Sequence, residues 1–422
     1  MCQWHMFSTD RSGAETWECV ARSNPQAQTL QAMKGMKTLR SGRNRRKWIY
    51  VLLLMGLLGL SGCGSPSSAS VEMSSQTELV KTGSIELQYA ENFAVDYYED
   101  GYKMLTTLPD SKRYLLVPEG QPVPRGLDED VSILQEPLQN IYLVASGVMD
   151  MFASVDAVDQ VRFSGQKQEN WYIQTAKDAM AAGDMIYAGK YSKPDYELLV
   201  SEGCDLAIEN RMITHSPEVV EMLQSFDIPV MIEYSSYEKH PLGKVEWVKF
   251  FGALTGKEAE AEEAFAEQTE ILEEVESGEK TGKTIAFFYV TSNGLIQVRQ
   301  STDYIPKLIE LAGGRYIFEN LEDGGSGRST LNMQVEDFYA GAKDADILIY
   351  NSSIDGGVTT VDELIGKCNI LKDFKAVQEG QVYCTTNDMY QQSMAIGYLL
   401  QDMHTVLTDD DTAKLRYLFL LQ

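Results

Sequence analysis

The sequence is poor in the residues that build catalytic and metal centres. Its 422 residues include only six cysteines and four histidines. No CxxC pair occurs, and the histidines show neither HxH nor HxxxH spacing, so no recognisable set of metal ligands is present. The GxSxG, HExxH and Walker glycine-loop motifs are also missing. We therefore expect no resident metal and no cofactor, and we expect that the protein is not an enzyme.

Basic residues are scarce as well. The chain has 36 Lys and Arg against 62 Asp and Glu, a formal net charge of −26. A surface this acidic repels the phosphates of nucleic acids and the headgroups of anionic lipids. The composition thus excludes nucleic acid as a partner, and any membrane attachment must come from something other than surface charge.

No apolar run is long enough to span a bilayer. Residues 48–60 are apolar or glycine, shorter than the ~20 residues a membrane helix needs, and they follow a basic cluster at 40–47. A basic stretch, a short apolar core and small residues at its exit are typical of a secretory signal. The sequence at that exit, Leu60-Ser61-Gly62-Cys63, resembles the bacterial lipobox. The resemblance implies that residues 1–62 are removed and that Cys63 is acylated; an ordinary signal peptide with a chance cysteine is the alternative.

The leader and the segment after it set the expected location. Met33 or Met36 is the expected translation start, within a leader that ends at residue 62. Residues 63–83 are rich in Ser and Gly and are predicted to be a tether. We expect a lipid-anchored protein on the extracellular or periplasmic side of the cell membrane.

The remaining chain has the pattern of an α/β protein. Its length favours two domains. Short apolar runs predict buried strands, and they alternate with segments of helical spacing, which favours parallel sheets covered by helices on both faces. The predicted strands are at 140–146, 204–210, 228–234, 284–290 and 345–351, and the predicted helices are at 194–202, 217–226 and 304–312.

One long acidic segment divides this pattern. Residues 257–277 contain neither Gly nor Pro and carry a narrow apolar stripe that includes Ala261, Phe265 and Leu272. This spacing predicts a single long helix. The predicted organisation is an N-terminal lobe at 84–255, a connecting helix at 256–278 and a C-terminal lobe at 279–422.

This order of elements resembles the class III solute-binding proteins of ABC importers. The segment "PDYELLVSEGCDLAIEN" is similar to a helix that leads into a central strand of the first lobe. The segments "IPKLIELAGGRYIFENL" and "AKDADILIYN" are similar to the corresponding parts of the second. The resemblance implies two Rossmann-like lobes joined by a single long helix. It also implies a monomer that hands its ligand to an ABC permease and the ATPase of that permease.

The resemblance further implies where the permease docks and what is carried. Members of the family present a glutamate on each lobe, ahead of the central strand, for arginines of the permease. The matching positions are Glu197, eight residues before Asp205, and Glu336, ten residues before Asp346. Family members bind ferric siderophores, haem or cobalamin, so a metal chelate or tetrapyrrole is the expected ligand.

Candidate ligand-binding residues follow the predicted strands, because ligands of open parallel sheets bind beyond the carboxyl ends of the strands. The set combines aromatic side chains, which cover flat apolar surfaces, with arginines, which pair with carboxylates or phenolates. It therefore favours an anionic metal chelate. The candidates are Ser146, Trp171, Tyr172, Arg211, Tyr237, Arg299, Arg315, Tyr316, Asn351 and Tyr390.

Two other functions stay open at this point. An extracellular enzyme on a similar two-lobed fold would need an acid/base pair in the cleft. A surface lipoprotein that binds another protein would need an exposed apolar groove. The sequence does not distinguish among the possible chelates.

Overall fold

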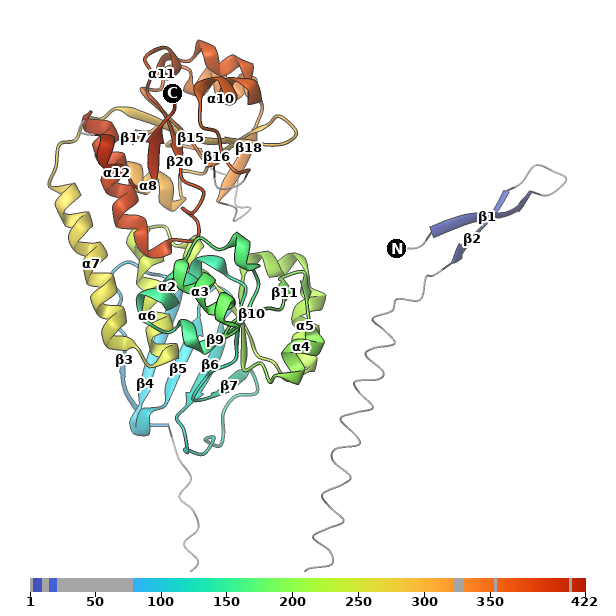
Figure 1. Ribbon diagram of the computed structural model, residues 1–422. Helices are drawn as coiled ribbons and strands as arrows, with labels where there is room; N and C mark the ends of the chain where they lie inside the picture. The colour runs from blue at the N-terminus through green and yellow to red at the C-terminus, as the bar shows by residue number, and fades with distance from the viewer. Residues whose placement is uncertain (1–2, 10–14, 21–78, 322–328, 353–354, 410–411) are drawn as a thin grey trace, which may run out of the picture. The chain divides into compact units, whose positions relative to one another are not determined.

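The computed structural model divides the chain into two compact units, which are drawn in Figure 1. It describes residues 3–9, 15–20, 79–321, 329–352, 355–409 and 412–422. In the first unit, Met1–Ser74, strands β1 (Gln3–Thr9) and β2 (Glu15–Val20) pair antiparallel. Cys63, the apolar run of the leader and the tether up to residue 78 lie outside the described residues. No helix in the described ranges is long and apolar enough to cross a membrane.

The described part of the second unit, Ser75–Gln422, is built on three large sheets. The first-lobe sheet is parallel throughout, in the order β10-β9-β8-β13-β14, and the second-lobe sheet has a parallel centre, β15-β19-β20, with antiparallel strands at its edges. These strands are β8 (Ile141–Leu143), β9 (Val161–Ser164), β10 (Ile186–Tyr187), β13 (Leu206–Asn210), β14 (Val230–Glu233), β15 (Thr284–Val290), β16 (Ile296–Arg299), β17 (Arg315–Tyr316), β18 (Thr330–Met333), β19 (Ile347–Tyr350), β20 (Val382–Thr385) and β21 (Leu418–Leu420).

Helices cover these sheets and connect the lobes (Figure 1). They are α2 (Ser146–Ser154), α3 (Gln174–Ala182), α4 (Tyr196–Ser201), α5 (Pro217–Ser225), α6 (Pro241–Thr255), α7 (Glu258–Glu276), α8 (Tyr304–Leu311), α9 (Val335–Ala342), α10 (Val361–Lys367), α11 (Lys375–Gln378) and α12 (Ile396–Thr408). The prediction of an α/β fold with parallel sheets in two lobes is confirmed, and each predicted strand and helix has a counterpart within two to three residues.

The third sheet was not predicted as a separate sheet. Its order is β3-β4-β5-β6-β7, antiparallel except for the last pair. The apolar alternation from Ser84 onward predicts strands, but it does not show which strands they pair with. The five strands pair among themselves and pack one face on α6. Their bounds are β3 (Lys81–Ser84), β4 (Phe93–Tyr98), β5 (Lys103–Thr107), β6 (Lys112–Val117) and β7 (Val131–Gln135), and the small pair β11 (Gly189–Lys190) and β12 (Lys193–Pro194) lies elsewhere.

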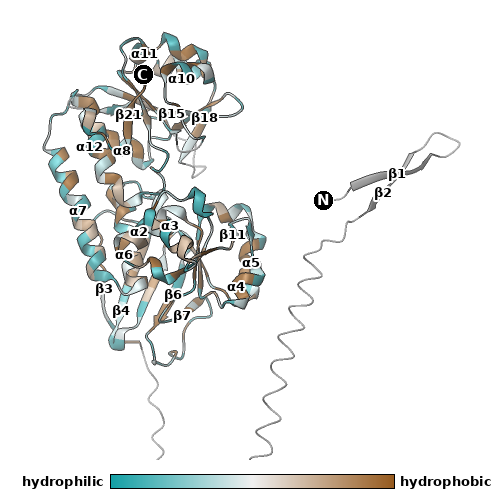
Figure 2. Cartoon of the chain, viewed as in Figure 1, coloured by the Kyte–Doolittle hydropathy of each residue, from teal (hydrophilic) through white to brown (hydrophobic). Residues whose placement is uncertain are grey.

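The long helix α7 runs along both lobes in Figure 1 and lies inside the predicted range 256–278. At 1.5 Å per residue its 19 residues extend ~28 Å. Its predicted apolar stripe is buried against α6 and α12, and its other positions are largely glutamate, which gives it the hydrophilic outer colouring in Figure 2. The helix is therefore an amphipathic strut shared by the two lobes.

In each lobe, an aspartate accepts hydrogen bonds from residues at the start of a neighbouring strand. Asp205, just before β13, accepts the backbone N–H groups of Gln139 and Asn140, which lead into β8. Asp346, just before β19, accepts the N–H and hydroxyl of Thr284, the first residue of β15. Hydrogen bonds from Lys375 and Thr284 lower the pKa of Asp346 to about 2, despite its partial burial. Each carboxylate thus aligns the starts of two neighbouring parallel strands.

Two buried carboxylates attach the third sheet to the first lobe. Glu246, in the middle of α6 and fully buried, accepts the backbone N–H groups of Gln88, Tyr89 and Ala90 at 2.8 Å each. Glu238 accepts those of Glu91 and Asn92 and the indole N–H of Trp247. The loop 88–92 therefore has five consecutive N–H groups bound by carboxylates, which are strong acceptors because they are charged.

We predict that Glu246→Ala lowers the free energy of unfolding by about 3 kcal/mol, because it leaves three N–H groups of the loop without an acceptor. The change is to be measured from urea unfolding curves. The matched control is Glu262→Ala, which removes an exposed partner of Lys249 and should change the stability by less than about 1 kcal/mol. Equal effects of the two variants would contradict the assignment.

Candidate functional site

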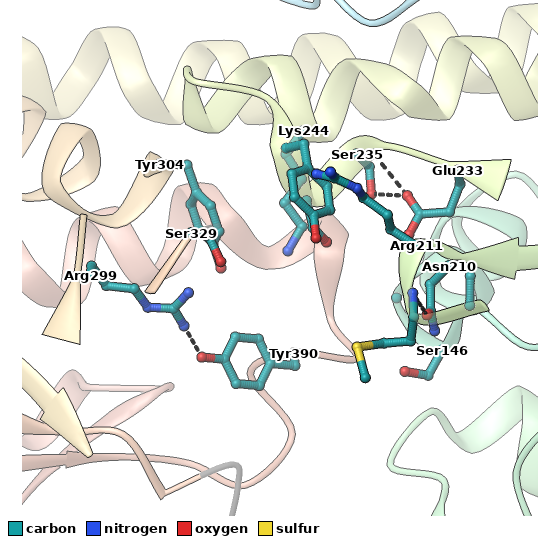
Figure 3. Close-up of a pocket in the computed structure, with 15 residues that line it drawn as sticks. Ser146, Asn210, Arg211, Glu233, Ser235, Lys244, Arg299, Tyr304, Ser329 and Tyr390 are labelled. Atoms are coloured by element: carbon teal, nitrogen blue, oxygen red, sulfur yellow. Dashed lines mark hydrogen bonds between the residues drawn. The ribbon is translucent and has the colours of Figure 1, made fainter. Parts of the chain in front are cut away.

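A cavity of about 250 Å³ lies where the two lobes meet (Figure 3). It is lined by residues that follow strands of both sheets, by the start of α2 and by the first turns of α6 and α8. In Figure 3, Arg299 and Tyr304 lie on one side, Arg211, Glu233 and Ser146 on the other, with Lys244 and Tyr390 between them. The lining residues are Ala145, Ser146, Gly147, Asn210, Arg211, Met212, Glu233, Ser235, Ser236, Tyr237, Lys244, Arg299, Tyr304, Ser329 and Tyr390.

The first lobe supplies one acid and one stacked arginine. Arg211 directly follows β13, and its guanidinium lies 4.5 Å from the centre of the Tyr237 ring. Glu233 ends β14, is 6 % exposed, and accepts hydrogen bonds from the N–H and hydroxyl of Ser235. Burial raises the pKa of Glu233, although the bonds from Ser235 and the charge of Lys244 oppose the shift. This wall can therefore offer both a cation and hydrogen-bonding oxygen atoms.

The second lobe supplies Arg299, the last residue of β16, which is 8 % exposed. Its guanidinium donates to the Tyr390 hydroxyl and lies 3.4 Å from a carboxylate oxygen of Asp303. Burial opposes the charge of Arg299, but the neighbouring Tyr390 and Asp303 raise its pKa overall. Asn351 donates to the same Tyr390 hydroxyl at 2.7 Å. Arg299 thus stays charged at the edge of the cavity.

Lys244 enters the cavity from α6. It is 3 % exposed, and its Nζ lies 4.9 Å from the centre of the Tyr304 ring. Burial lowers its pKa, and Glu233, Tyr390 and Asp303 partly offset that effect. Together with Arg211 and Arg299 it places three basic side chains around one small space.

Half of the residues proposed from the sequence meet at this cavity. Ser146, Arg211, Tyr237, Arg299 and Tyr390 all line it. Ser146, Arg211, Tyr237 and Tyr390 follow strands of the two sheets or start the next helix, as predicted, whereas Arg299 is the last residue of the antiparallel strand β16. Their contact with a ligand stays a prediction.

The structure does not bring the other five to the cavity lining. Trp171 is 1 % exposed in the first-lobe core and donates its indole N–H to Ser164. Tyr316 is buried behind the cavity, with its hydroxyl bonded to the backbone of Arg299. Asn351 is buried behind Tyr390. Tyr172 is exposed beside the cleft, and Arg315 is exposed on β17. The prediction that these five residues line the ligand site is therefore corrected. The side chains of Trp171, Tyr316 and Asn351 are buried, and those of Tyr172 and Arg315 face solvent.

Lys244, Glu233 and Tyr304 are among the ten lining residues that were not predicted from the sequence. Glu233 lies inside a predicted strand, and Tyr304 starts a predicted helix. Lys244 belongs to α6, whose residues from Pro241 to Leu254 are all buried. Lys244 could have been singled out from the sequence, because it lies in a largely apolar helix and lysine is almost never fully buried without a partner.

The segment between β20 and α12 crosses from one lobe to the other beside the cavity. Gln391 accepts the N–H of Tyr172 at 2.8 Å and donates to the carbonyl of Asn170 at 2.7 Å. Met394 donates its N–H to Asp150 of α2 at 2.7 Å. A Cβ on Gly147 would lie 2.7 Å from the Ser393 hydroxyl and 3.2 Å from the carbonyl oxygen of Tyr390, so glycine gives this segment room to approach α2 closely. The lobes are thus joined here by three hydrogen bonds.

Direct metal binding by the protein has no support in the described part of the chain. There, no group of three or more His, Cys, Asp or Glu side chains is arranged to hold a metal ion. The described cysteines, Cys204, Cys368 and Cys384, are buried and separate.

The two lobes, the shared helix and the cavity between the lobes define a class III solute-binding protein. The chain belongs to the periplasmic binding protein family, whose model matches residues 145–389, more than half of the chain. It is therefore a binding protein of the ABC-transporter type, and its family implies a small-molecule ligand and a permease partner. The family consists of solute-binding proteins rather than enzymes, as expected. The third sheet, β3 to β7, precedes the matched segment.

Relatives and solved structures agree with this assignment. An uncharacterized lipoprotein of Methanocaldococcus jannaschii is 24 % identical over 398 residues, covering 85 % of this chain and 92 % of that protein. A possible iron-binding periplasmic protein of Staphylococcus epidermidis has a TM-score of 0.50 at 16 % identity, covering 64 % of this chain and 98 % of that one. A periplasmic heme-binding protein of Vibrio cholerae gives 0.51 at 14 %, covering 63 % and 98 %. These structures are similar in fold.

We predict that Asp150 makes the stability of the protein depend on pH between about 4 and 6. Burial raises its pKa from 3.8 to about 6, although the bond from Met394 lowers it. Because the folded state holds this proton more tightly, its contribution is complete below pH 4 and is lost as the pH rises through 6. The free energy of unfolding of the wild type should fall relative to that of Asp150→Asn by on the order of 2 kcal/mol from pH 4 to pH 7. Parallel stability curves for the two proteins would contradict this.

Proposed function

We propose that the protein captures an anionic metal chelate, such as a ferric siderophore or a related chelate or tetrapyrrole, and delivers it to an ABC permease. The observation that carries the proposal is the cluster of Arg211, Lys244 and Arg299 around the cavity between the lobes. These three cations are gathered in a chain whose net charge is −26. Such a concentration of positive charge in a largely buried space favours an anionic solute, since charges interact more strongly away from water.

The tyrosines and the fold neighbours also support a chelate. Tyr237, Tyr304 and Tyr390 line the cavity with rings and hydroxyls, which suit the flat, oxygen-rich surface of a chelate. Solved proteins of the same fold include heme-binding and petrobactin-binding proteins; the petrobactin-binding protein, from Bacillus subtilis, has a TM-score of 0.50 and 14 % identity, covering 64 % of this chain and 92 % of that one. The metal would be cargo held by the chelate.

Delivery is proposed to use one glutamate on each lobe. Glu197 and Glu336 are exposed in the first turns of α4 and α9. Each helix leads into a central strand, β13 or β19, through the aspartate that aligns the strand starts. The two glutamates therefore hold equivalent positions in the two lobes, as arginines of a two-fold permease would require. We further propose that the protein acts as a monomer held at the membrane by lipid on Cys63, in keeping with relatives named as lipoproteins.

The first prediction from this function concerns ligand binding. Arg211→Ala should weaken the affinity for an anionic chelate at least tenfold, because it removes a charged donor from the cavity wall. The matched control is Arg315→Ala, an exposed arginine outside the lining, which should bind as the wild type does. Calorimetric titration with ferric siderophores, haem and cobalamin measures both. The function is contradicted if the wild type binds none of them.

The second prediction concerns delivery. Glu197→Arg should impair uptake of the chelate by whole cells while the affinity of the purified protein stays unchanged, because Glu197 lies outside the cavity. Reversing a charge at an interface brings like charges together, at a cost of several kcal/mol. Glu218→Arg, on the neighbouring helix α5, is the control for a charge reversal elsewhere on the lobe. Uptake at the wild-type rate by Glu197→Arg would refute the docking role.

A further inference from the structure

Lys244 has a buried charge for which the described part of the protein provides no counter-charge in contact. Within those residues, its Nζ forms neither a hydrogen bond nor an ion pair, and its close neighbour is the ring of Tyr304 at 4.9 Å. The rest of the side chain is enclosed in the first lobe, with 3 % of the residue exposed. A buried ammonium without a partner destabilises a folded protein. Its presence at the cavity indicates that the partner comes from outside.

Lys249, five residues further along α6, is a buried lysine with a structural role and serves as a comparison for Lys244. It is 5 % exposed, and its Nζ lies 3.0 Å from Glu262 and 3.6 Å from Glu246. The same chain thus pairs one buried lysine with two carboxylates and leaves the other facing the cavity. The contrast separates a structural lysine from one that is available to a ligand.

The other charges at the cavity increase the need for an anion. Arg299 lies close enough to lower the pKa of Lys244 further, so two buried cations repel each other across the space. Asp303 is committed to Arg299 and to the N–H of Ile305. Glu233 accepts hydrogen bonds from the N–H and hydroxyl of Ser235 and is the one carboxylate among the described residues that line the cavity, against three basic side chains. The lining therefore has an excess of positive charge.

We propose that the solute is a compact polycarboxylate, free or as the oxygen ligand of a metal ion, with one carboxylate paired to Lys244 and another to Arg211 or Arg299. In its metal-bound form this proposal rests on the proposed function and specifies which class of chelate the cavity takes. Binding of citrate without its ferric complex would support the polycarboxylate and contradict the capture of a chelate. Carboxylates match both kinds of cation, as single oxygen atoms for an ammonium and as a planar pair for a guanidinium.

The size of the cavity and the residues that line it favour this class over a macrocycle. Pockets for drug-sized ligands measure ~300–1,000 Å³. This cavity measures about 250 Å³, and most of the residues that line it are charged residues, serines and tyrosines. Ser146 and Ser329 add hydroxyls that suit a hydroxycarboxylate. A tetrapyrrole would need a broader apolar slot.

The test uses calorimetric titration of the protein with citrate, ferric citrate, inorganic phosphate, haem and a ferric catecholate siderophore. Wild type should bind citrate or its ferric complex. Lys244→Met should lose at least tenfold in affinity, and Lys244→Arg should retain more of it. Lys249→Met is the matched control, because it removes a buried lysine of the same helix that does not line the cavity. Its affinity should stay within about twofold of wild type at a temperature where it is folded.

Stability provides a second measurement that separates binding from a structural role. Lys244→Met should raise the melting temperature of the ligand-free protein by roughly 2 °C or more, because it removes an uncompensated buried charge. Lys249→Met should lower it. A Lys244→Met variant that is destabilised would make Lys244 structural and overturn the proposal.

The panel distinguishes failure of this proposal from failure of the proposed function. Binding of haem or the catecholate without citrate or ferric citrate would overturn the polycarboxylate and leave chelate binding standing. Binding of phosphate alone would overturn both, as would no binding at all. Equal affinity of wild type and Lys244→Met for citrate would remove Lys244 from the site.

Discussion

The pairing of two buried carboxylates with the backbone of one loop is the interaction on which the binding site depends. Glu238 and Glu246 together accept five N–H groups of residues 88–92 and so fasten the third sheet to α6. α6 is buried along its length and contacts α2, α7 and α8, the helices that surround the cavity or join the lobes. Because this helix carries Lys244, the loop that the carboxylates hold also sets the position of the cation at the centre of the cavity.

The two lobes align their central strands in the same way, with an aspartate, but place different side chains at the cavity. Asp205 and Asp346 align the central strands in the two sheets, which brings the ends of those strands to the cleft. At those ends, the first lobe adds Arg211 and Glu233, whereas the second adds Arg299 from the antiparallel strand β16. The aspartates align the strands, and the added side chains give the cavity its charge. The same fold can therefore be kept while the site built on it changes.

Most of the fold could be predicted from the sequence, because buried parallel strands are short apolar runs that few other structures produce. The rule that ligands lie beyond strand ends pointed to Arg211, which follows β13 and lines the cavity, and to Arg299, which lines it as the last residue of the antiparallel strand β16. It failed at Trp171 and Tyr316, since a residue after a strand can turn inward as readily as toward the cleft, and only the packing decides. It could not find Lys244, which reaches the cavity from the first turn of a buried helix and not from a segment that follows a strand. The separate third sheet was missed because alternation of apolar and polar residues predicts that a segment is a strand but not which strands it pairs with.

The segment at residues 390–394 links the two walls of the cavity. Gln391 and Met394 fasten it to the first lobe by three hydrogen bonds, worth about 1 kcal/mol each. Tyr390, the residue before Gln391, accepts hydrogen bonds from Arg299 and Asn351 of the second lobe. The position of the Arg299 guanidinium at the cavity is therefore tied to the first lobe through a single short segment of backbone.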